Sequence, residues 1–156
     1  MKYWLFKTEP DEYSINDLAN AGPTGTPWDG IRNYQARNFL RDEVAVGDRV
    51  LIYHSSCAAV GLAGIARVIK AAYADPDQFD TNSNYFDAKA TLDNPRWYRV
   101  DIAFSARFDE LITLAQLKAT RGLESMVLLR QGRLSVQPVT AHEWGIIHSL
   151  GSIRGK

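Results

Sequence analysis

The sequence predicts a single α+β domain in which a curved, barrel-like sheet is flanked by helices. Its 156 residues give room for one sizeable core, whereas two independent domains would each be small. Segments with strand-like alternation gather around the middle of the chain, and helix-start patterns occur between and after them. Strands grouped in this way with interspersed helices are typical of an α+β domain.

The strands are predicted from short apolar or alternating runs bounded by turn residues. "YWLFK" opens the chain as an aromatic strand, and "RVLIYHS" follows the turn "VGD". The expected strands are Tyr3–Lys7, Arg49–His54, Gly61–Tyr73, Arg96–Phe108 and Leu134–Pro138. The polar segment Ala74–Pro95, rich in Pro, Asp and Asn, is expected to be an irregular excursion.

The helices are predicted from capping patterns. Ser14 with Asp17, Thr113 with Gln116 and Thr140 with Glu143 each place a hydroxyl three residues before an acid or amide, as in a capping box. "RNYQARNFLRDE" also has a helical pattern, with Tyr34, Phe39 and Leu40 expected on its inward side. We expect one domain over residues 2–150 and a disordered tail over residues 151–156.

The charge balance restricts the kind of partner. Eighteen basic residues equal eighteen acidic ones, which argues against a protein that coats long nucleic acid or an anionic membrane by charge alone. The single cysteine, Cys57, rules out an internal disulfide and suits a reducing compartment. The early apolar run "YWLF" is too short for an export or membrane segment, so a cytoplasmic protein is expected.

Residues for catalysis or metal binding do not form a recognisable set. No nucleophile elbow, phosphate-binding loop or dinucleotide-binding glycine pattern is present. His142 and His148 are six residues apart on the last helix, a spacing that does not place both on one face for a metal. His54 and Cys57 would point to opposite faces of a strand, so a structural cysteine is the better interpretation. We therefore expect no metal and no cofactor.

Aromatic residues with polar neighbours are the more informative pattern. Trp28 lies on an expected loop, Trp97 begins a strand, and "YHS" ends another. Flat rings beside amide, hydroxyl and guanidinium groups are what a planar heterocycle with a hydrogen-bonding edge requires. Composition leaves a second interpretation open, in which the aromatic residues plug the end of a small barrel and the polar groups are solvated.

The order of several unusual blocks resembles the EVE domain, a member of the PUA-like group that also contains YTH and ASCH domains. These blocks are "YWLFKTEPDEYSINDL", "WDGIRNYQARN", "GDRVLIYHSS", "GLAGIARV", "NPRWYRVDI" and "LLRQGRLSVQPVTAHEW", and they span the chain from about Lys2 to Leu150. The resemblance implies a PUA-like bent β-barrel with flanking helices. It also implies a reader of modified nucleobases, with modified cytosines such as 5-methylcytosine in DNA as the leading ligands and an RNA role proposed for bacterial members.

Carried onto this sequence, the resemblance implies a pocket between the first strand, the Trp28 loop and the "YHS" strand end. The residues implied to bind the base are Lys7, Thr8, Trp28, Asn33, Tyr34, Tyr53, His54, Ser55, Trp97, Ser135 and Gln137. Those implied to bind phosphate are Arg32, Arg37 and Arg133. The helix start after "WDG" would add free backbone N–H groups and a positive dipole end.

Two functions follow as hypotheses. The first is a non-catalytic module that binds nucleic acid, DNA or RNA, or a nucleotide, and takes one modified base into an aromatic pocket. The second is an enzyme acting on a modified nucleotide or RNA base, with His54 as general acid or base. The absence of a metal set, cofactor loop or paired carboxylates favours the first.

Overall fold

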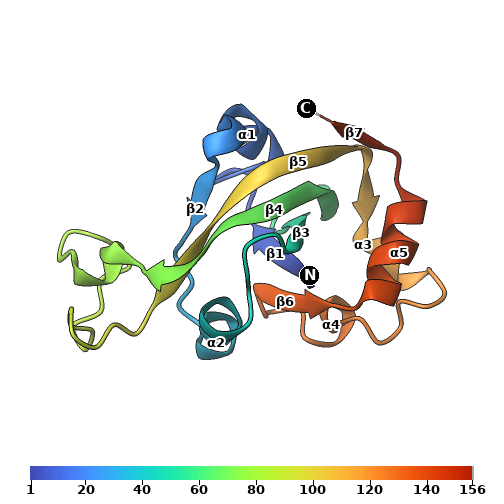
Figure 1. Ribbon diagram of the computed structural model, residues 1–156. Coiled ribbons are helices and arrows are strands. Elements are labelled where there is room, and N and C mark those ends of the chain that lie inside the picture. The colour runs from blue at the N-terminus through green and yellow to red at the C-terminus, as the bar shows by residue number, and fades with distance from the viewer. Residues whose placement is uncertain (156) are drawn as a thin grey trace.

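The computed structural model describes the backbone of residues 1–155 and the side chains of residues 1–152 (Figure 1). Its strands are β1 (Tyr3–Thr8), β2 (Thr26–Trp28), β3 (Arg49–His54), β4 (Gly61–Ala74), β5 (Tyr98–Thr113), β6 (Val136–Val139) and β7 (Ile153–Gly155). They form one sheet in the order β2-β5-β4-β3-β1-β6, and β7 also pairs with β5. Only β1 and β3 are parallel among these pairs.

The sheet bends along its two long strands. β4 and β5 pair with several register shifts, and such bulges increase local twist and curvature. In the described part of the chain β2 and β6 end the path without pairing to each other, so the sheet stays open. The α+β class with a curved sheet and flanking helices is confirmed.

The helices are α1 (Ile15–Asn20), α2 (Tyr34–Asp42), α3 (Leu114–Lys118), α4 (Val127–Arg130) and α5 (Ala141–Leu150), with 3-10 turns η1 (Gly22–Thr24) and η2 (Pro76–Phe79). All three capping boxes expected from the sequence are present, at Ser14, Thr113 and Thr140. α2 begins later than expected, because Asn33 is its N-cap and accepts from the backbone N–H of Ala36. No described helix is long and apolar enough to cross a membrane.

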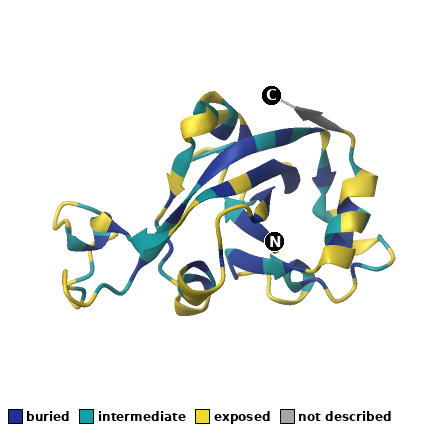
Figure 2. Cartoon of the chain, in the orientation of Figure 1, coloured by how far each residue is buried: buried dark blue, intermediate teal, exposed yellow. Residues whose placement is uncertain are grey.

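Two hydrophobic cores cover the two faces of the sheet. Successive strand residues point to opposite faces, so Trp4 and Phe6 of β1 enter one core while Leu5 enters the other. The first core also receives Leu40 from α2, and the second receives Ile147 from α5. Figure 2 shows the buried residues concentrated along the middle of the strands and on the inward sides of the helices.

Residues 75–97 leave the body of the molecule between β4 and β5 and form an excursion at its far end (Figure 1). The buried side chain of Gln78 holds it together. Its Nε2 donates to the carbonyls of Asp75 and Trp97, both at 2.8 Å, and its Oε1 accepts from the N–H groups of Arg96 and Trp97, both at 2.9 Å. The irregular excursion expected from the sequence is thus an ordered one.

Several local expectations differ from the structure. Thr26–Trp28 is a strand rather than a loop, since it pairs with Val100–Ile102 of β5. The helical pattern predicts that Tyr34 faces inward, but its side chain is exposed. In the expected tail, Ile153–Gly155 pairs with Ala106–Phe108 as β7, and Lys156 lies outside the described residues.

Candidate functional site

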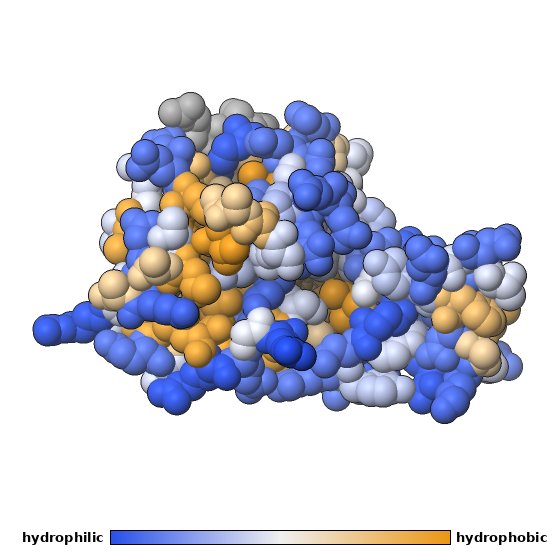
Figure 3. Space-filling view, turned by 180° about the vertical axis from the view of Figure 1, so that it is seen from behind, coloured by the Kyte–Doolittle hydropathy of each residue, from blue (hydrophilic) through white to orange (hydrophobic). Residues whose placement is uncertain are grey.

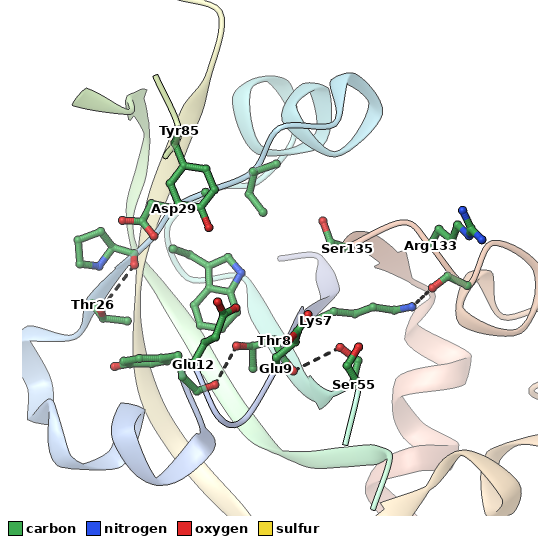
Figure 4. Close-up of a pocket in the computed structure, with 17 residues that line it drawn as sticks. Lys7, Thr8, Glu9, Glu12, Thr26, Asp29, Ser55, Tyr85, Arg133 and Ser135 are labelled. Carbon is green, nitrogen blue, oxygen red and sulfur yellow. Dashed lines mark hydrogen bonds between the residues drawn. The ribbon is translucent and has the colours of Figure 1, made fainter. Parts of the chain in front are cut away.

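A cleft of about 690 Å³ opens where β1, β2 and β3 end, and its size lies within the usual range for ligand sites. Figure 4 shows side chains from distant parts of the chain converging on it. Its lining consists of Lys7, Thr8, Glu9, Glu12, Tyr13, Thr26, Pro27, Trp28, Asp29, Gly30, Ile31, Ser55, Ser56, Tyr85, Gly132, Arg133 and Ser135.

The indole of Trp28 is the largest ring at the cleft, and its position is fixed by packing against two other aromatic rings. It packs against Phe6, with ring centroids 5.8 Å apart, and meets Tyr13 edge-on at 6.0 Å. Only 7% of Trp28 is exposed, so the residue belongs to the core while it lines the cleft. A ring held in this way offers a stacking surface whose orientation does not have to be ordered on binding.

Tyr85 supplies a second ring from the excursion, and Gly30 permits its approach. Gly30 has φ +73°, and a Cβ there would lie 3.0 Å from Tyr85 Cζ. The backbone carbonyl of Tyr85 accepts from Arg32 Nε at 3.3 Å and from Nη2 at 3.0 Å. Arg32 is itself anchored by Nη1, 3.2 Å from the buried carboxylate of Asp75. The position of the Tyr85 ring at the cleft therefore depends on the ordered conformation of the excursion.

The charges at the cleft are mixed. Three carboxylates, Glu9, Glu12 and Asp29, share the lining with two cations, Lys7 and Arg133. Figure 4 shows Asp29 beside Tyr85 on one side of the cleft and Lys7 directed toward the Arg133 loop on the other. A groove built to hold a polyanion would carry an excess of cations.

Two of these charged groups are shifted by burial. Desolvation, followed by the nearby charge of Asp75, raises the pKa of the Asp29 carboxyl, and Arg99 at 3.6 Å opposes the shift. Desolvation lowers the pKa of the Lys7 ammonium, which donates to the carbonyl of Gly132. Both groups pay a desolvation cost when charged, so a ligand group that pairs with either gains more than it would at an open surface.

Polar groups complete the lining near the end of β1. The Thr8 hydroxyl donates to the carbonyl of Tyr13 at 2.8 Å, and the N–H of Ser55 donates to the carbonyl of Thr8 at 2.9 Å. Ser56 has φ +53°, an uncommon conformation for a residue other than glycine that tends to occur at functional sites. The site therefore combines fixed rings, carboxylate acceptors and a cationic side, which suits a flat polar heterocycle joined to an anionic group.

Comparisons with known proteins assign the fold to a family. The EVE domain model matches residues 2–150. The chain belongs to the EVE domain family. Human thymocyte nuclear protein 1 is 41% identical to it over 165 residues, covering 95% of this chain and 73% of the human protein.

Solved structures agree with this assignment. A Pseudomonas syringae protein superposes with a TM-score of 0.89 at 50% identity, covering 95% of this chain and 98% of the other. The human THYN1 protein, solved in complex with DNA containing 5-methylcytosine, has a TM-score of 0.91 at 38% identity, covering 96% and 97%.

This EVE domain brings part of the expected site together. Of the residues expected to bind base or phosphate, the cleft is lined by Lys7, Thr8, Trp28, Ser55, Arg133 and Ser135. They come from β1, β2, the end of β3 and the turn before β6, which agrees with the expected location between the first strand, the Trp28 segment and the "YHS" strand end. Their binding roles remain predictions.

The other expected residues lie outside the lining and have structural partners. Asn33 caps α2, Tyr53 is buried, and His54 Nε2 accepts from the N–H of Ile15 at 3.1 Å. Gln137 is also buried and donates to the carbonyls of Leu134 and Gln131, which shapes the turn that carries Arg133.

The remaining four lie outside the cleft lining, where the start of α2 meets the excursion. Arg32 binds Asp75, Trp97 Nε1 donates to Asp87 at 2.8 Å, Tyr34 stacks on Trp97, and Arg37 Nη1 donates to the carbonyl of Arg96 at 2.9 Å.

Sequence reasoning missed the carboxylates and the second ring. Glu9 and Glu12 follow β1 within a block already quoted for the resemblance, and Asp29 adjoins Trp28. A signal existed for Glu9 and Asp29, because each lies next to an expected pocket residue, Thr8 or Trp28. Tyr85 had none, since the excursion has no periodicity that would direct it back to Trp28.

Proposed function

We propose that this EVE domain is a non-catalytic reader of modified cytosine in DNA, and that its cleft accepts one base displaced from the helical stack. The observation that carries the proposal is the placement of a fixed indole, a second ring and a carboxylate around one cleft of base-binding size. The complex of the human THYN1 protein with DNA containing 5-methylcytosine supports the choice of ligand.

The carboxylates favour a base with an exocyclic amine. Carboxylate oxygens accept hydrogen bonds from the cytosine N4 amine, whereas the corresponding O4 of thymine is an acceptor and would face them with its lone pairs. Asp29 is the best placed of the three, because it adjoins Trp28 in the chain and lies beside Tyr85 (Figure 4). We assign Asp29 the role of reading the amine edge while Trp28 stacks on the ring.

The side of the cleft that carries Lys7 and Arg133 is suited to the phosphate backbone of the DNA. Lys7 and Arg133 line the part of the cleft away from Asp29, so a phosphate bound there leaves the Asp29 side to the base. Ser55 and Ser135 add hydroxyl groups near the same side. One or two cations imply few phosphate contacts, which agrees with the balanced charge of the chain.

The test is a titration with single-stranded oligonucleotides of one sequence that carry cytosine, 5-methylcytosine or thymine at one position, each made as DNA and as RNA. We expect the tightest binding for 5-methylcytosine in DNA, and thymine binding weaker by about tenfold, in line with roughly 1–3 kcal/mol per edge contact. Asp29→Asn should reduce the discrimination between 5-methylcytosine and thymine. Glu110→Gln removes an exposed carboxylate from the far part of β5 and should leave it unchanged.

Equal affinity for all three bases in wild-type protein would rule out base reading. Tighter binding to the RNA series would move the proposal to a modified RNA base. The enzyme hypothesis has no supporting observation, since His54 lies outside the cleft lining and its Nε2 is engaged by the N–H of Ile15.

A further inference from the structure

A second aromatic surface lies beside the cleft, at the start of α2. Tyr34 is 47% exposed, and its ring stacks on Trp97 with centroids 4.8 Å apart and an interplanar angle of 28°. Trp97 is only 5% exposed and is fixed by the hydrogen bond from Nε1 to Asp87. An exposed tyrosine is therefore held in place by a buried ring, which resembles a binding surface more than a core contact.

Two arginines border this tyrosine. The Cζ atoms of Arg37 and Arg96 lie 4.8 Å and 5.7 Å from the centroid of its ring. Arg96 is paired with Asp87 at 3.7 Å, but no carboxylate in the described part of the chain lies within ion-pair distance of Arg37. The guanidinium of Arg37 donates instead to the Arg96 carbonyl and to the side-chain amide oxygen of Asn38. Its charge is thus available to an anion.

The surface is continuous with the cleft. Tyr85 lines the cleft, and the Cζ atom of Arg32 lies 5.1 Å from the centroid of its ring. The same Cζ atom lies 5.5 Å from the centroid of the Trp97 ring, on which Tyr34 stacks. Figure 1 shows α2 beside the point where the excursion leaves the body. On the rear face, Figure 3 shows mainly hydrophilic residues at the excursion end, while the larger apolar group lies on the body of the molecule.

We propose that Tyr34, Arg37 and Arg96, supported by Trp97, form a second nucleic-acid subsite that holds a nucleotide flanking the one in the cleft. We refer to these four residues as the Tyr34 platform. Unpaired bases stack on aromatic rings and on guanidinium planes, and the adjacent phosphate pairs with arginine. This inference rests on the proposed function of the cleft, since the flanking nucleotide arrives with the base that the cleft binds.

A comparison of ligand lengths separates the two subsites. 5-Methyl-2′-deoxycytidine monophosphate reaches only the cleft, whereas a longer single-stranded DNA with the same central base reaches both. Tyr34→Ala should weaken binding of the long DNA by about tenfold, as expected for loss of one stacked base, and change mononucleotide binding by less than about twofold. Tyr34→Phe keeps the ring and should restore the affinity for the long DNA.

Matched arginine variants test whether the charge of Arg37 contributes to DNA binding. Arg37→Gln should weaken binding of the long DNA and flatten its salt dependence by about one unit of log–log slope. Arg41→Gln removes an arginine from the same helix that is already paired with Asp42 at 2.8 Å, and it should change neither quantity. Melting temperatures of all variants show whether each remains folded.

The outcomes separate this inference from the function on which it rests. If wild-type protein discriminates between bases but Tyr34→Ala and Arg37→Gln bind the long DNA normally, the Tyr34 platform is refuted and the reader function stands. If wild-type protein shows no discrimination while both variants still weaken binding of the long DNA, the base-reading function fails and the Tyr34 platform stands as a nucleic-acid contact. Equal weakening of mononucleotide and long DNA would also overturn the platform.

Discussion

Replacing Trp28 with alanine should affect both folding and binding, because the indole belongs to the core and to the cleft. Only 7% of the residue is exposed, and it packs on Phe6 and Tyr13. Large-to-small substitutions of buried aromatic residues cost about 3–5 kcal/mol. For a domain of this size each kcal/mol lowers the melting temperature by roughly 2–4 °C, so we expect a decrease of about 6–20 °C.

The binding effect is measured separately, at a temperature at which the variant is folded. Loss of stacking should weaken binding of the 5-methylcytosine DNA by about tenfold or more, from roughly 1–3 kcal/mol per stacked base. Trp28→Phe keeps an aromatic plane and should show a smaller loss in both assays. A melting temperature of Trp28→Ala within about 2 °C of wild type would refute the packing argument. Unchanged affinity per folded molecule would refute the stacking argument.

Three further results are expected. Gln78→Ala removes the acceptor of the Arg96 and Trp97 N–H groups, whereas the carbonyls of Asp75 and Trp97 keep a backbone donor each. The loss should lower stability by about 2 kcal/mol or more and weaken base binding, because the excursion carries Tyr85; normal stability would contradict the role given to Gln78. Burial lowers the pKa of His54, so below about pH 6.5 the unfolded chain binds more protons than the folded protein does. The unfolding free energy of wild type should therefore fall as the pH is lowered. The fall should be smaller in His54→Gln than in wild type or in the exposed control His148→Gln. Equal pH dependence in all three proteins would show that His54 does not contribute. Arg133→Gln should flatten the salt dependence of DNA binding by about one unit of slope with base preference unchanged, and a steeper or unaltered slope would remove Arg133 from the phosphate contacts.

The elements that the sequence predicted well are those specified by local chemistry. Capping boxes at Ser14, Thr113 and Thr140 depend on residues three positions apart, and their helices begin where expected. Thr26–Trp28 could not be recognised as a strand, because three residues are too few for a periodicity and the pairing partner in β5 lies far along the chain.

In the candidate site, too, residues in locally informative segments could be predicted, whereas residues placed by long-range contacts could not. The cleft includes Lys7, Trp28 and Ser55, whose surroundings in the sequence were informative. Tyr85 enters it only because Gln78 and Arg32 fold the excursion back against Gly30, and contacts of that kind leave no local pattern. The helical pattern predicts that Tyr34 faces inward, but its ring instead covers Trp97 from outside.

The most direct test of the base-reading function is a crystal structure of this protein with a short single-stranded DNA that contains 5-methylcytosine. We expect the modified base to lie in the cleft, stacked against Trp28, with its exocyclic amine within hydrogen-bond distance of Asp29 and the adjacent phosphate toward Lys7 and Arg133. A modified base bound away from the cleft, with Trp28 uncontacted, would contradict it.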